Sequence, residues 1–363
     1  MTRPRDRSRS RLAPSGATAA LLLVAAGLAA ACSSTMDDDA VGTEAVVLTL
    51  MTHDSFDVST AVLEDFAART GITVTLLPLG DAGSALNQTI LTAAAPQGDL
   101  LFGVDSTFLG RALASDLFLP YRSPELASID PASDLDPTGR LTPVDVGEVC
   151  LNFDRTWFEG RDLAPPQDLA DLVTPAYAGL TVVQDPSTSS PGLAFLLATI
   201  ARFGEEAAFA WWEELRANDV RVVSGWSDAY YTAFSLYGGD RPIVVSYASS
   251  PAAEVHFADP TPERAPTAVV TASCYRQVEF VGILASTEHP EAARLLVDHL
   301  LGRAFQEDVP LRMFVRPVRL DARLPEVFVE HAADVPDALE LDPALVAAKR
   351  DAWIARWTTT VLR

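Results

Sequence analysis

The chain has 363 residues, of which 27 are Lys or Arg and 49 are Asp or Glu, so its formal charge is −22. This acidity argues against nucleic acid as the main partner, because a phosphate backbone requires a basic protein face. Its 3 cysteines are too few for a disulfide-dense scaffold or for a zinc module with four cysteine ligands, and the length allows more than one domain.

The first 31 residues indicate an export signal. Five arginines stand within residues 3–11, and an uncharged, largely apolar run follows at 17–31. That run is shorter than the roughly 18 to 20 residues of a membrane-spanning helix. A basic start, a short apolar run and small residues before a cut are typical of a secretory signal peptide. Its removal takes away five arginines and one aspartate, which leaves a charge of about −26 on the rest.

The segment LAAAC, which ends at Cys32, resembles the lipobox of bacterial lipoproteins, in which the cysteine is lipidated and becomes the new N-terminus. The alternative is an ordinary signal peptide that leaves Cys32 free. Residues 32–44 are small, polar and acidic, and cannot bury a core. We expect them to form a flexible tether that holds the body, through its lipid anchor, on the outer (periplasmic or extracellular) face of the cytoplasmic membrane.

The body begins with alternating strands and helices. The run at 72–77 is rich in β-branched residues, and a helix bounded by Asp57 or Ser59 and by Gly71 precedes it. Strands are predicted at 45–51, 72–77 and 100–104, and helices at 59–69, 84–95 and 109–115. This alternation predicts an α/β domain with a mostly parallel sheet.

A second alternating set follows a long predicted strand at 146–153. Its strands are predicted at 180–184, 220–223 and 243–247, and its helices at 191–203, 205–218 and 227–237. The chain then returns with a strand at 278–284, a helix at 290–301 and a C-terminal helix capped by Asp342. Two such sets predict a bilobed fold of two mixed-sheet α/β lobes joined by hinge strands. We expect lobe 1 to comprise 45–145 plus 275–363, and lobe 2 to comprise 146–274.

The sequence contains no common catalytic or cofactor motif. GxxxxGK[ST], GxGxxG, GxSxG, HExxH and CxxC are all absent. The five histidines are scattered without metal-ligand spacing. We therefore expect no catalytic residue, no metal and no cofactor, although an enzyme whose catalytic groups assemble only in space stays open.

One candidate binding loop runs from a predicted buried strand into a helix. Residues 184–193 read QDPSTSSPGL, in which Ser189 or Ser190 can cap the helix and Pro191 suits its first turn. Free backbone N–H groups at such a helix start can bind an anion. The alternative is a well-capped helix without a ligand.

A second candidate is aromatic. Residues 225–231 read GWSDAYY and residues 246–251 read SYASSP, so Trp226, Tyr230 and Tyr247 could face one cleft from separate element ends. Aromatic faces hold flat heterocycles and cations. The alternative is that each ring belongs to the core.

A third candidate lies just past two predicted strands. Asp54 stands in THDSF, and Asp81 stands in LGDAGSALN. Ligands of open α/β sheets bind at the carboxyl ends of strands. Both carboxylates are therefore candidates to accept from an amino group or to pair with a cation, and the alternative is that they are turn and cap residues.

These segments resemble the periplasmic thiamine-binding proteins of ABC transporters, in the type 2 solute-binding superfamily. The same resemblance extends to the segments LLFGVDSTFL, TPVDVG, YRQVE and the C-terminal LDPALVAAKRDAWIARW. The resemblance runs from about Val46 to the C-terminus. It implies that Trp226 and Tyr247 flank the ligand rings. The full set of candidate ligand-binding residues is Asp54, Asp81, Ala82, Ser189, Ser190, Trp226, Tyr230, Tyr247, Ala248, Ser249, Ser250, Tyr275 and Phe314.

The resemblance implies a monomeric receptor that captures thiamine, thiamine monophosphate or thiamine diphosphate and delivers it to a permease and its ATPase. Any phosphate would meet the helix start at Pro191. Four positions depart from the family pattern: His53 replaces an aromatic residue, Ala82 replaces glycine, Phe314 replaces tryptophan, and Arg316 replaces tyrosine. Arg316 could favour a phosphorylated ligand if it faces the cleft.

Two alternatives are kept. The same fold could bind a polyamine, a sugar or ferric ion, although Tyr230 and Tyr231, as neighbours on a predicted helix, would face different ways. A thiaminase-like enzyme would need a nucleophile such as Cys150, whose strand setting looks buried. Cys150 and Cys274 lie near the two hinge crossings, so in an oxidising compartment they are either bridged or two buried thiols.

Overall fold

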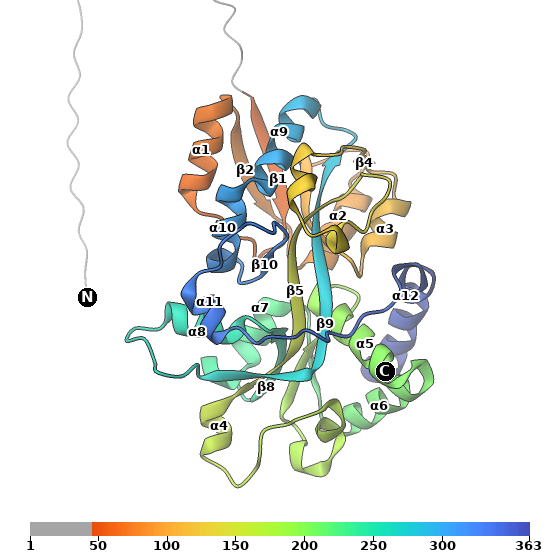
Figure 1. Ribbon diagram of the computed structural model, residues 1–363. Coiled ribbons are helices and arrows are strands. Elements are labelled where there is room, and N and C mark those ends of the chain that lie inside the picture. The colour runs from red at the N-terminus through yellow and green to blue at the C-terminus, as the bar shows by residue number, and fades with distance from the viewer. Residues whose placement is uncertain (1–45) are drawn as a thin grey trace, which may run out of the picture. The chain divides into compact units, whose positions relative to one another are not determined.

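The computed structural model describes residues 46–363, which form one compact unit (Figure 1). The predicted signal peptide, the lipidation of Cys32 and the tether lie outside the described residues. Within the described part of the chain, no helix combines the length and the apolar composition of a membrane span.

Ten strands of the described residues join in one mixed sheet. The main path runs in the order β2 (Thr73–Pro78), β1 (Val47–Thr52), β3 (Leu100–Asp105), β9 (Thr267–Leu284), β5 (Thr142–Asp154), β8 (Ile243–Tyr247), β6 (Thr181–Gln184) and β7 (Arg221–Val223). The two short strands β4 (Phe118–Leu119) and β10 (Arg316–Pro317) pair with β9 and β5. The mixed α/β fold predicted from the alternating pattern is confirmed.

The sheet consists of two parallel sections joined by antiparallel strands. β1 is parallel to both β2 and β3, and β6 is parallel to both β7 and β8. Between them, β9 and β5 pair antiparallel from Thr142 opposite Val281 to Asp154 opposite Thr267. Figure 1 shows these two strands running through both halves of the molecule, so they form the predicted hinge connections.

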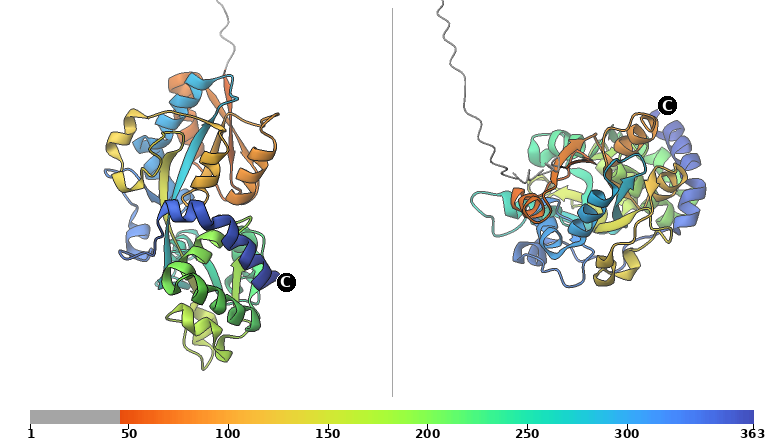
Figure 2. Two further views of the ribbon diagram at one scale, coloured as in Figure 1. Left: turned by 90° about the vertical axis from the view of Figure 1, so that its right-hand side faces the viewer. Right: turned by 90° about the horizontal axis from the view of Figure 1, so that it is seen from above.

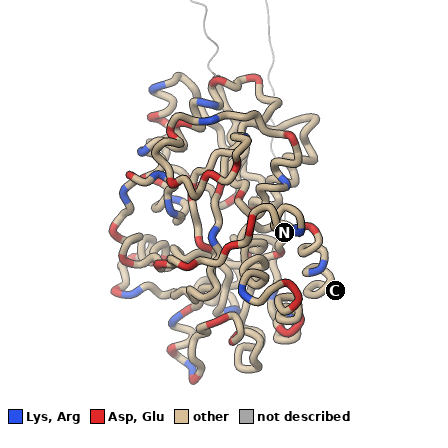
Figure 3. The backbone as a smooth tube through the Cα atoms, turned by 45° about the vertical axis from the view of Figure 1, so that its right-hand side comes forward, with Lys and Arg blue, Asp and Glu red and all other residues tan. Residues whose placement is uncertain are grey.

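Helices cover the sheet in both halves (Figures 1 and 2). In the half that contains β1 they are α1 (Thr60–Thr70), α2 (Ala82–Leu91), α3 (Leu109–Ala114), α9 (Pro290–Leu301) and α10 (Arg303–Arg312). In the half that contains β8 they are α4 (Arg155–Glu159), α5 (Ser190–Phe203), α6 (Glu205–Ala217), α7 (Trp226–Asp228) and α8 (Ser250–Phe257). The last two are α11 (Glu326–His331) and α12 (Pro343–Trp357). Figure 3 shows acidic and basic residues scattered over both halves.

Cys150 and Cys274 form a disulfide between β5 and β9. Both cysteines are fully buried, and the pairing register of the two strands shifts between Val149 and Leu151 beside the bridge. The disulfide therefore links the two hinge strands covalently where their regular pairing is interrupted.

The helix predicted at 227–237 is present only as three short pieces, the last of which is a 3-10 turn at Ser235–Tyr237. α7 ends at Asp228, a π turn covers Ala229–Ala233, and Phe234 then forms an isolated bridge with Arg241. The Gly239 backbone lies so close to Ala233 that an added Cβ would come within 2.1 Å of its carbonyl oxygen. This close approach requires glycine, and the extended backbone of Phe234 interrupts the helical run.

The C-terminal helix contacts both halves. The Arg350 guanidinium lies over the Phe108 ring, 4.3 Å from its centroid, in the half that contains β1. Trp357 meets Trp212 of α6 edge to face, with ring centroids 5.5 Å apart. Figure 2 shows α12 running alongside the helices of the other half. α12 therefore packs against both halves. The lobe limits expected from the sequence remain a prediction.

Candidate ligand-binding cleft

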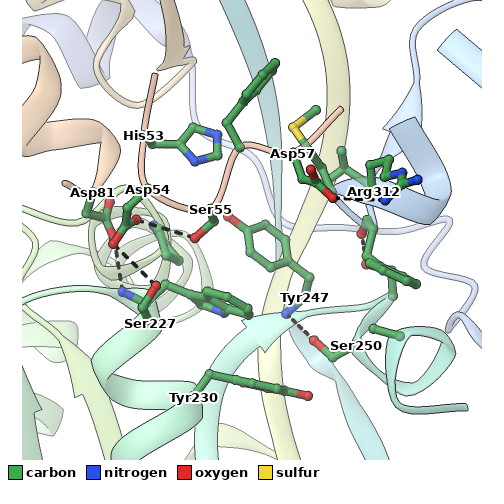
Figure 4. Close-up of a pocket in the computed structure, with 18 of the residues that line it drawn as sticks. His53, Asp54, Ser55, Asp57, Asp81, Ser227, Tyr230, Tyr247, Ser250 and Arg312 are labelled. Carbon is green, nitrogen blue, oxygen red and sulfur yellow. Dashed lines mark hydrogen bonds and ion pairs between the residues drawn. The ribbon is translucent and has the colours of Figure 1, made fainter. Parts of the chain in front are cut away.

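A cavity of about 410 Å³ lies where residues from both halves meet (Figure 4). Its walls come from the ends of β1 and β8, from the starts of α2, α5, α7 and α8, and from the segment after α10. Ten of the predicted ligand-binding residues line it: Asp54, Asp81, Ala82, Ser190, Trp226, Tyr230, Tyr247, Ser249, Ser250 and Phe314.

Three predicted residues do not line the cavity. Ser189 is fully buried, and its hydroxyl donates to Asp81 Oδ2 at 3.0 Å. Ala248 packs in the buried cluster around the disulfide. Tyr275 shares a strand face with Glu279, but four residues along a strand separate two side chains by about 13 Å. Its ring is buried there, and its hydroxyl accepts from the Leu341 N–H at 3.3 Å.

The aromatic wall is built on Trp226. Its indole stacks on Tyr230, with centroids 5.0 Å apart and planes inclined by 16°. Its Nε1–H donates to Ser246 Oγ at 2.9 Å, and the Tyr247 ring lies 6.5 Å away at 58°. One stacking partner and one hydrogen bond therefore fix the orientation of the indole, which a pre-organised binding surface requires.

The neighbouring tyrosines Tyr230 and Tyr231 both line the cavity, but Tyr230 is 2% exposed and Tyr231 is 52% exposed, with ring planes inclined by 85°. They stand on a π turn at Ala229–Ala233, which replaces the regular helix that was predicted there. The hydroxyls of Tyr230 and Tyr237 each donate to Glu254 Oε1 at 2.8 Å. Burial, followed by the adjacent Glu254 carboxylate, raises the pKa of Tyr230 well above its ordinary value. The Tyr230 hydroxyl is thus a neutral group engaged with Glu254.

Asp81 joins the two halves of the molecule. It precedes α2, and its carboxylate accepts from Ser190 N–H at 2.9 Å, from Trp226 N–H at 3.0 Å and from the Ser189 hydroxyl. Beside it, the Ser84 N–H donates to the Thr188 carbonyl oxygen at 3.0 Å. Burial raises the pKa of the Asp81 carboxyl, and the accepted hydrogen bonds oppose that rise.

The predicted anion site at the start of α5 is therefore filled by a side chain of this protein. Ser189 caps the helix by accepting from the Gly192 N–H, Pro191 stands in the first turn, and the Ser190 N–H is already bonded to Asp81. A ligand phosphate at this helix start, as the resemblance implied, would have to displace the Asp81 carboxylate. The structure does not favour that expectation.

Further polar residues, which were not among the predicted ligand-binding residues, also line the cavity. Glu279 lines it from β9, and His53 Nε2 lies 3.4 Å from Glu279 Oε1. Burial lowers the pKa of His53, but the Glu279 carboxylate outweighs that effect, so the pKa is raised overall. Both residues stand in segments already singled out, THDSF and YRQVE, so their position in those segments was an available signal. The other additions are Ser55, Phe56, Asp57, Ser227, Tyr231, Tyr237, Ala253, Glu254, Phe257, Arg312, Met313 and Val315, besides Pro191 of the predicted loop.

Arg312, at the end of α10, and Arg316, in β10, differ in their access to the cavity. Arg312 lines it, and its guanidinium contacts Ser59 Oγ at 3.0 Å and Asp57 Oδ2 at 3.4 Å. Arg316 is outside the lining, with its Nε 3.7 Å from Glu148 and its guanidinium over the Phe328 ring. The cation available to a ligand in this region is therefore Arg312, whereas Arg316 was the arginine considered from the sequence.

The family model for bacterial extracellular solute-binding proteins matches residues 96–348. A thiamine-binding periplasmic protein of Salmonella typhimurium is 31% identical over 321 residues, which cover 87% of this chain and 94% of the relative. The protein of the same description from Escherichia coli gives the same identity and coverage. A solved structure described as a periplasmic thiamin binding protein superposes with a TM-score of 0.78 at 30% identity, covering 87% of this chain and 96% of that one.

Proposed function

This chain belongs to the bacterial extracellular solute-binding proteins, and we propose that it is the receptor that captures thiamine for an ABC importer. The observation that carries the proposal is the cavity itself, in which aromatic rings and carboxylates from both halves converge. Its volume of about 410 Å³ lies in the range of small-molecule sites. Thiamine offers two flat rings, one of them permanently cationic, and an amino group.

The lining suits each part of that ligand. Trp226 and Tyr247 present aromatic faces, which attract flat and cationic rings. The Asp54 carboxylate, which accepts from the Ser227 hydroxyl at 3.4 Å, has capacity left to accept from an amino group. The Asp81 carboxylate already accepts hydrogen bonds from Ser189, Ser190 and Trp226 of the other half. We therefore assign Asp81 to holding the two halves together in the closed cleft.

The receptor is expected to return its ligand chemically unchanged. The relatives named above are described as binding proteins. Cys150, the nucleophile considered for a thiamine-degrading enzyme, is buried and bonded to Cys274, so it has no thiolate to offer. Incubation with thiamine and an amine or thiol nucleophile, followed by mass spectrometry, should recover intact thiamine. Appearance of free pyrimidine and thiazole products would contradict this assignment.

Other ligands on the same fold can be separated by a panel measurement. Among residues 46–363, no group of three or more His, Cys, Asp or Glu side chains is arranged to hold a metal ion. The Tyr230 hydroxyl, a candidate iron ligand, is bonded to Glu254. In thermal-shift titrations we expect thiamine to raise Tm and expect spermidine, ferric citrate and simple sugars to leave it unchanged. A larger shift with any of these three than with thiamine would reassign the ligand.

Replacing Asp81 with alanine should weaken thiamine binding by about 30- to 100-fold, or about 2 to 3 kcal/mol. The reason is that the Asp81 carboxylate, in one half, accepts the hydrogen bonds that connect it to the other half. The Ser190 and Trp226 N–H groups would be left without their partner. Asp57→Ala is a matched control, because Asp57 lines the cavity but bonds residues of its own half. Solution scattering should also show a more open ligand-free protein for Asp81→Ala. Equal affinities of the Asp81→Ala and wild-type proteins would refute the role.

The phosphorylated forms of the ligand are proposed to use Arg312. Arg312→Ala should weaken thiamine monophosphate binding by about 10-fold relative to thiamine, because a charge-assisted contact to phosphate is lost. Arg316→Ala is the control and should leave the ratio of the two affinities unchanged, since Arg316 does not line the cavity. Calorimetric titrations of both variants with thiamine and its mono- and diphosphate measure this. A change in the ratio with Arg316→Ala alone would overturn the assignment.

The family and the N-terminal sequence together support a proposal for the place of the protein in the cell. We propose that residues 1–31 are removed, that Cys32 carries the lipid anchor, and that the monomeric body acts outside the cytoplasmic membrane beside its permease and ATPase. A Cys32→Ser variant expressed in cells should move from the membrane fraction to the soluble fraction. Retention of that variant on the membrane would exclude Cys32 as the anchor.

A further inference from the structure

Three carboxylates stand side by side on one face of the central sheet. Asp105 on β3 and Asp145 on β5 are both paired in register with Glu279 on β9, which lies between them. Directly opposite residues of neighbouring antiparallel strands project to the same face, a few ångströms apart. Like charges in such positions repel, so three ionised carboxylates could not be held there without compensation.

The row is buried at its two ends and open to the cavity at its centre. Asp105 is fully buried and Asp145 is 1% exposed, whereas Glu279 lines the cavity. Asp105 is satisfied by the Ser190 hydroxyl and by the Thr107 N–H at 2.6 Å. Asp145 Oδ2 has no hydrogen-bond partner. None of the hydrogen bonds described above for the site involves this Asp145 oxygen, which lies beside Glu279.

Few positive groups compensate the row. His53, at the end of β1, is the basic titratable group in contact with Glu279, with its Nε2 3.4 Å from Glu279 Oε1. From α2 and the β1 end, Asp81 and Asp54 add negative charge near His53. From β8, the neutral hydroxyl of Tyr247 contacts Gln277 Oε1 at 3.5 Å, and Arg350 on α12 is the cation that acts on Asp105.

We propose that Glu279, flanked by Asp105 and Asp145, is the counter-charge that selects a cationic ring, and that the proton held between Asp145 and Glu279 leaves for solvent when that ring binds. The inference rests on thiamine as the ligand and assigns the groups that distinguish its charged ring from a neutral one. A bound cation replaces the proton as the charge that compensates the row. The ligand itself is not altered.

The sign of the pH dependence follows from this exchange. Burial, followed by the Glu279 charge, raises the pKa of Asp145 well above its ordinary value, and burial raises the pKa of Asp105 to about 6. In the free protein the Asp145 carboxyl therefore keeps its proton at pH values at which a separate carboxyl is ionised, and a bound cation lowers the pKa of Asp145. Affinity is then highest above the free-protein pKa, and it falls as the pH drops through it, by up to about tenfold per pH unit for one proton.

The test is calorimetric titration of the exported protein with thiamine, in buffers of different ionisation enthalpy, between about pH 5 and pH 8. The dependence of the observed heat on the buffer gives the number of protons released. We expect between about 0.5 and 1 proton at pH 6 in the wild type. A neutral thiamine analogue, in which carbon replaces the positively charged ring nitrogen, should bind more weakly and release none.

Two variants and a control identify the group that releases the proton. Asp145→Asn should lower the number of protons released to less than half of the wild-type value, because only Asp105 is then left to contribute, and Glu279→Gln should weaken thiamine about tenfold or more while changing the neutral analogue by less than about threefold. His53→Gln is the control, because His53 is the other titratable group in contact with Glu279. It should retain proton release. Circular dichroism verifies that each variant is folded.

The outcomes separate this inference from the proposed function. Tight thiamine binding without buffer-dependent heat, or with proton release lost in His53→Gln and kept at more than half of the wild-type value in Asp145→Asn, would overturn the inference and leave the thiamine receptor intact. Equal weakening of thiamine and the neutral analogue by Glu279→Gln would also overturn it. Failure of every protein, including the wild type, to bind thiamine would instead remove the proposed function on which the inference rests.

Discussion

Replacing Trp226 with alanine is expected to weaken thiamine binding by about 1,000-fold, or about 4 kcal/mol. The indole lines the cavity, stacks on Tyr230 and is fixed by its hydrogen bond to Ser246. Its loss removes an oriented aromatic face and lets the Tyr230 ring move. Calorimetric titration with thiamine measures the change directly.

Two further variants make the Trp226 result specific. Trp226→Phe keeps a smaller aromatic face without the Nε1 donor, so it should lose only about tenfold. Trp157→Ala removes an indole that lies outside the cavity lining, next to Phe158, and should leave affinity unchanged. A loss below about threefold with Trp226→Ala would show that the indole is a packing residue and not a ligand face.

Removing the disulfide should produce the largest change in folding stability. The bridge joins cysteines 124 residues apart in sequence, so its loss restores much chain entropy to the unfolded state. We expect the double variant Cys150→Ala, Cys274→Ala to lose about 3 to 5 kcal/mol of the free energy of unfolding. Urea denaturation of both proteins under the same conditions measures the difference.

The same double variant should keep its ligand. Both cysteines lie outside the cavity lining, so thiamine affinity at a temperature where the variant is folded should change by less than about threefold. Adding a reducing agent to the wild type should reproduce the stability loss. Equal unfolding free energies of the oxidised and reduced wild-type proteins would mean that the bridge adds nothing to stability.

Regular elements with strong local signals were predictable from the sequence. α9 runs over Pro290–Leu301, as predicted from its proline start and its terminal Gly302, and the alternating pattern correctly gave the α/β class. The long strands were underestimated. β9 begins at Thr267, eleven residues before the predicted start, because exposed and polar residues such as Thr271 and Arg276 interrupt its hydrophobic pattern.

The aromatic and serine segments located the cavity, but not how each residue acts there. Asp81 and Ser190 are 109 residues apart, so no local pattern could reveal that a side chain fills the helix start at α5. Tyr231 stands on a π turn that the sequence pattern did not predict, and the Gly239 backbone packs closely against Ala233 at the end of that turn.

The carboxylate row was also beyond local sequence reasoning. Asp105, Asp145 and Glu279 are far apart in the chain and meet only through the register of three strands. Tyr275 illustrates the converse error, because it shares the strand face of Glu279 yet lies too far along β9 to reach the cavity. Motif resemblance identifies the segment, and only the register decides which of its side chains meets a ligand.

We propose that the body of this protein binds thiamine at one site between its two halves. The most direct test of this binding is calorimetric titration of residues 32–363, carrying Cys32→Ser so that no lipid can be attached, with thiamine at neutral pH. We predict one site per molecule with a Kd below about 10 µM, or about −7 kcal/mol. Absence of binding at thiamine concentrations up to about 1 mM, which corresponds to about −4 kcal/mol, would contradict the account.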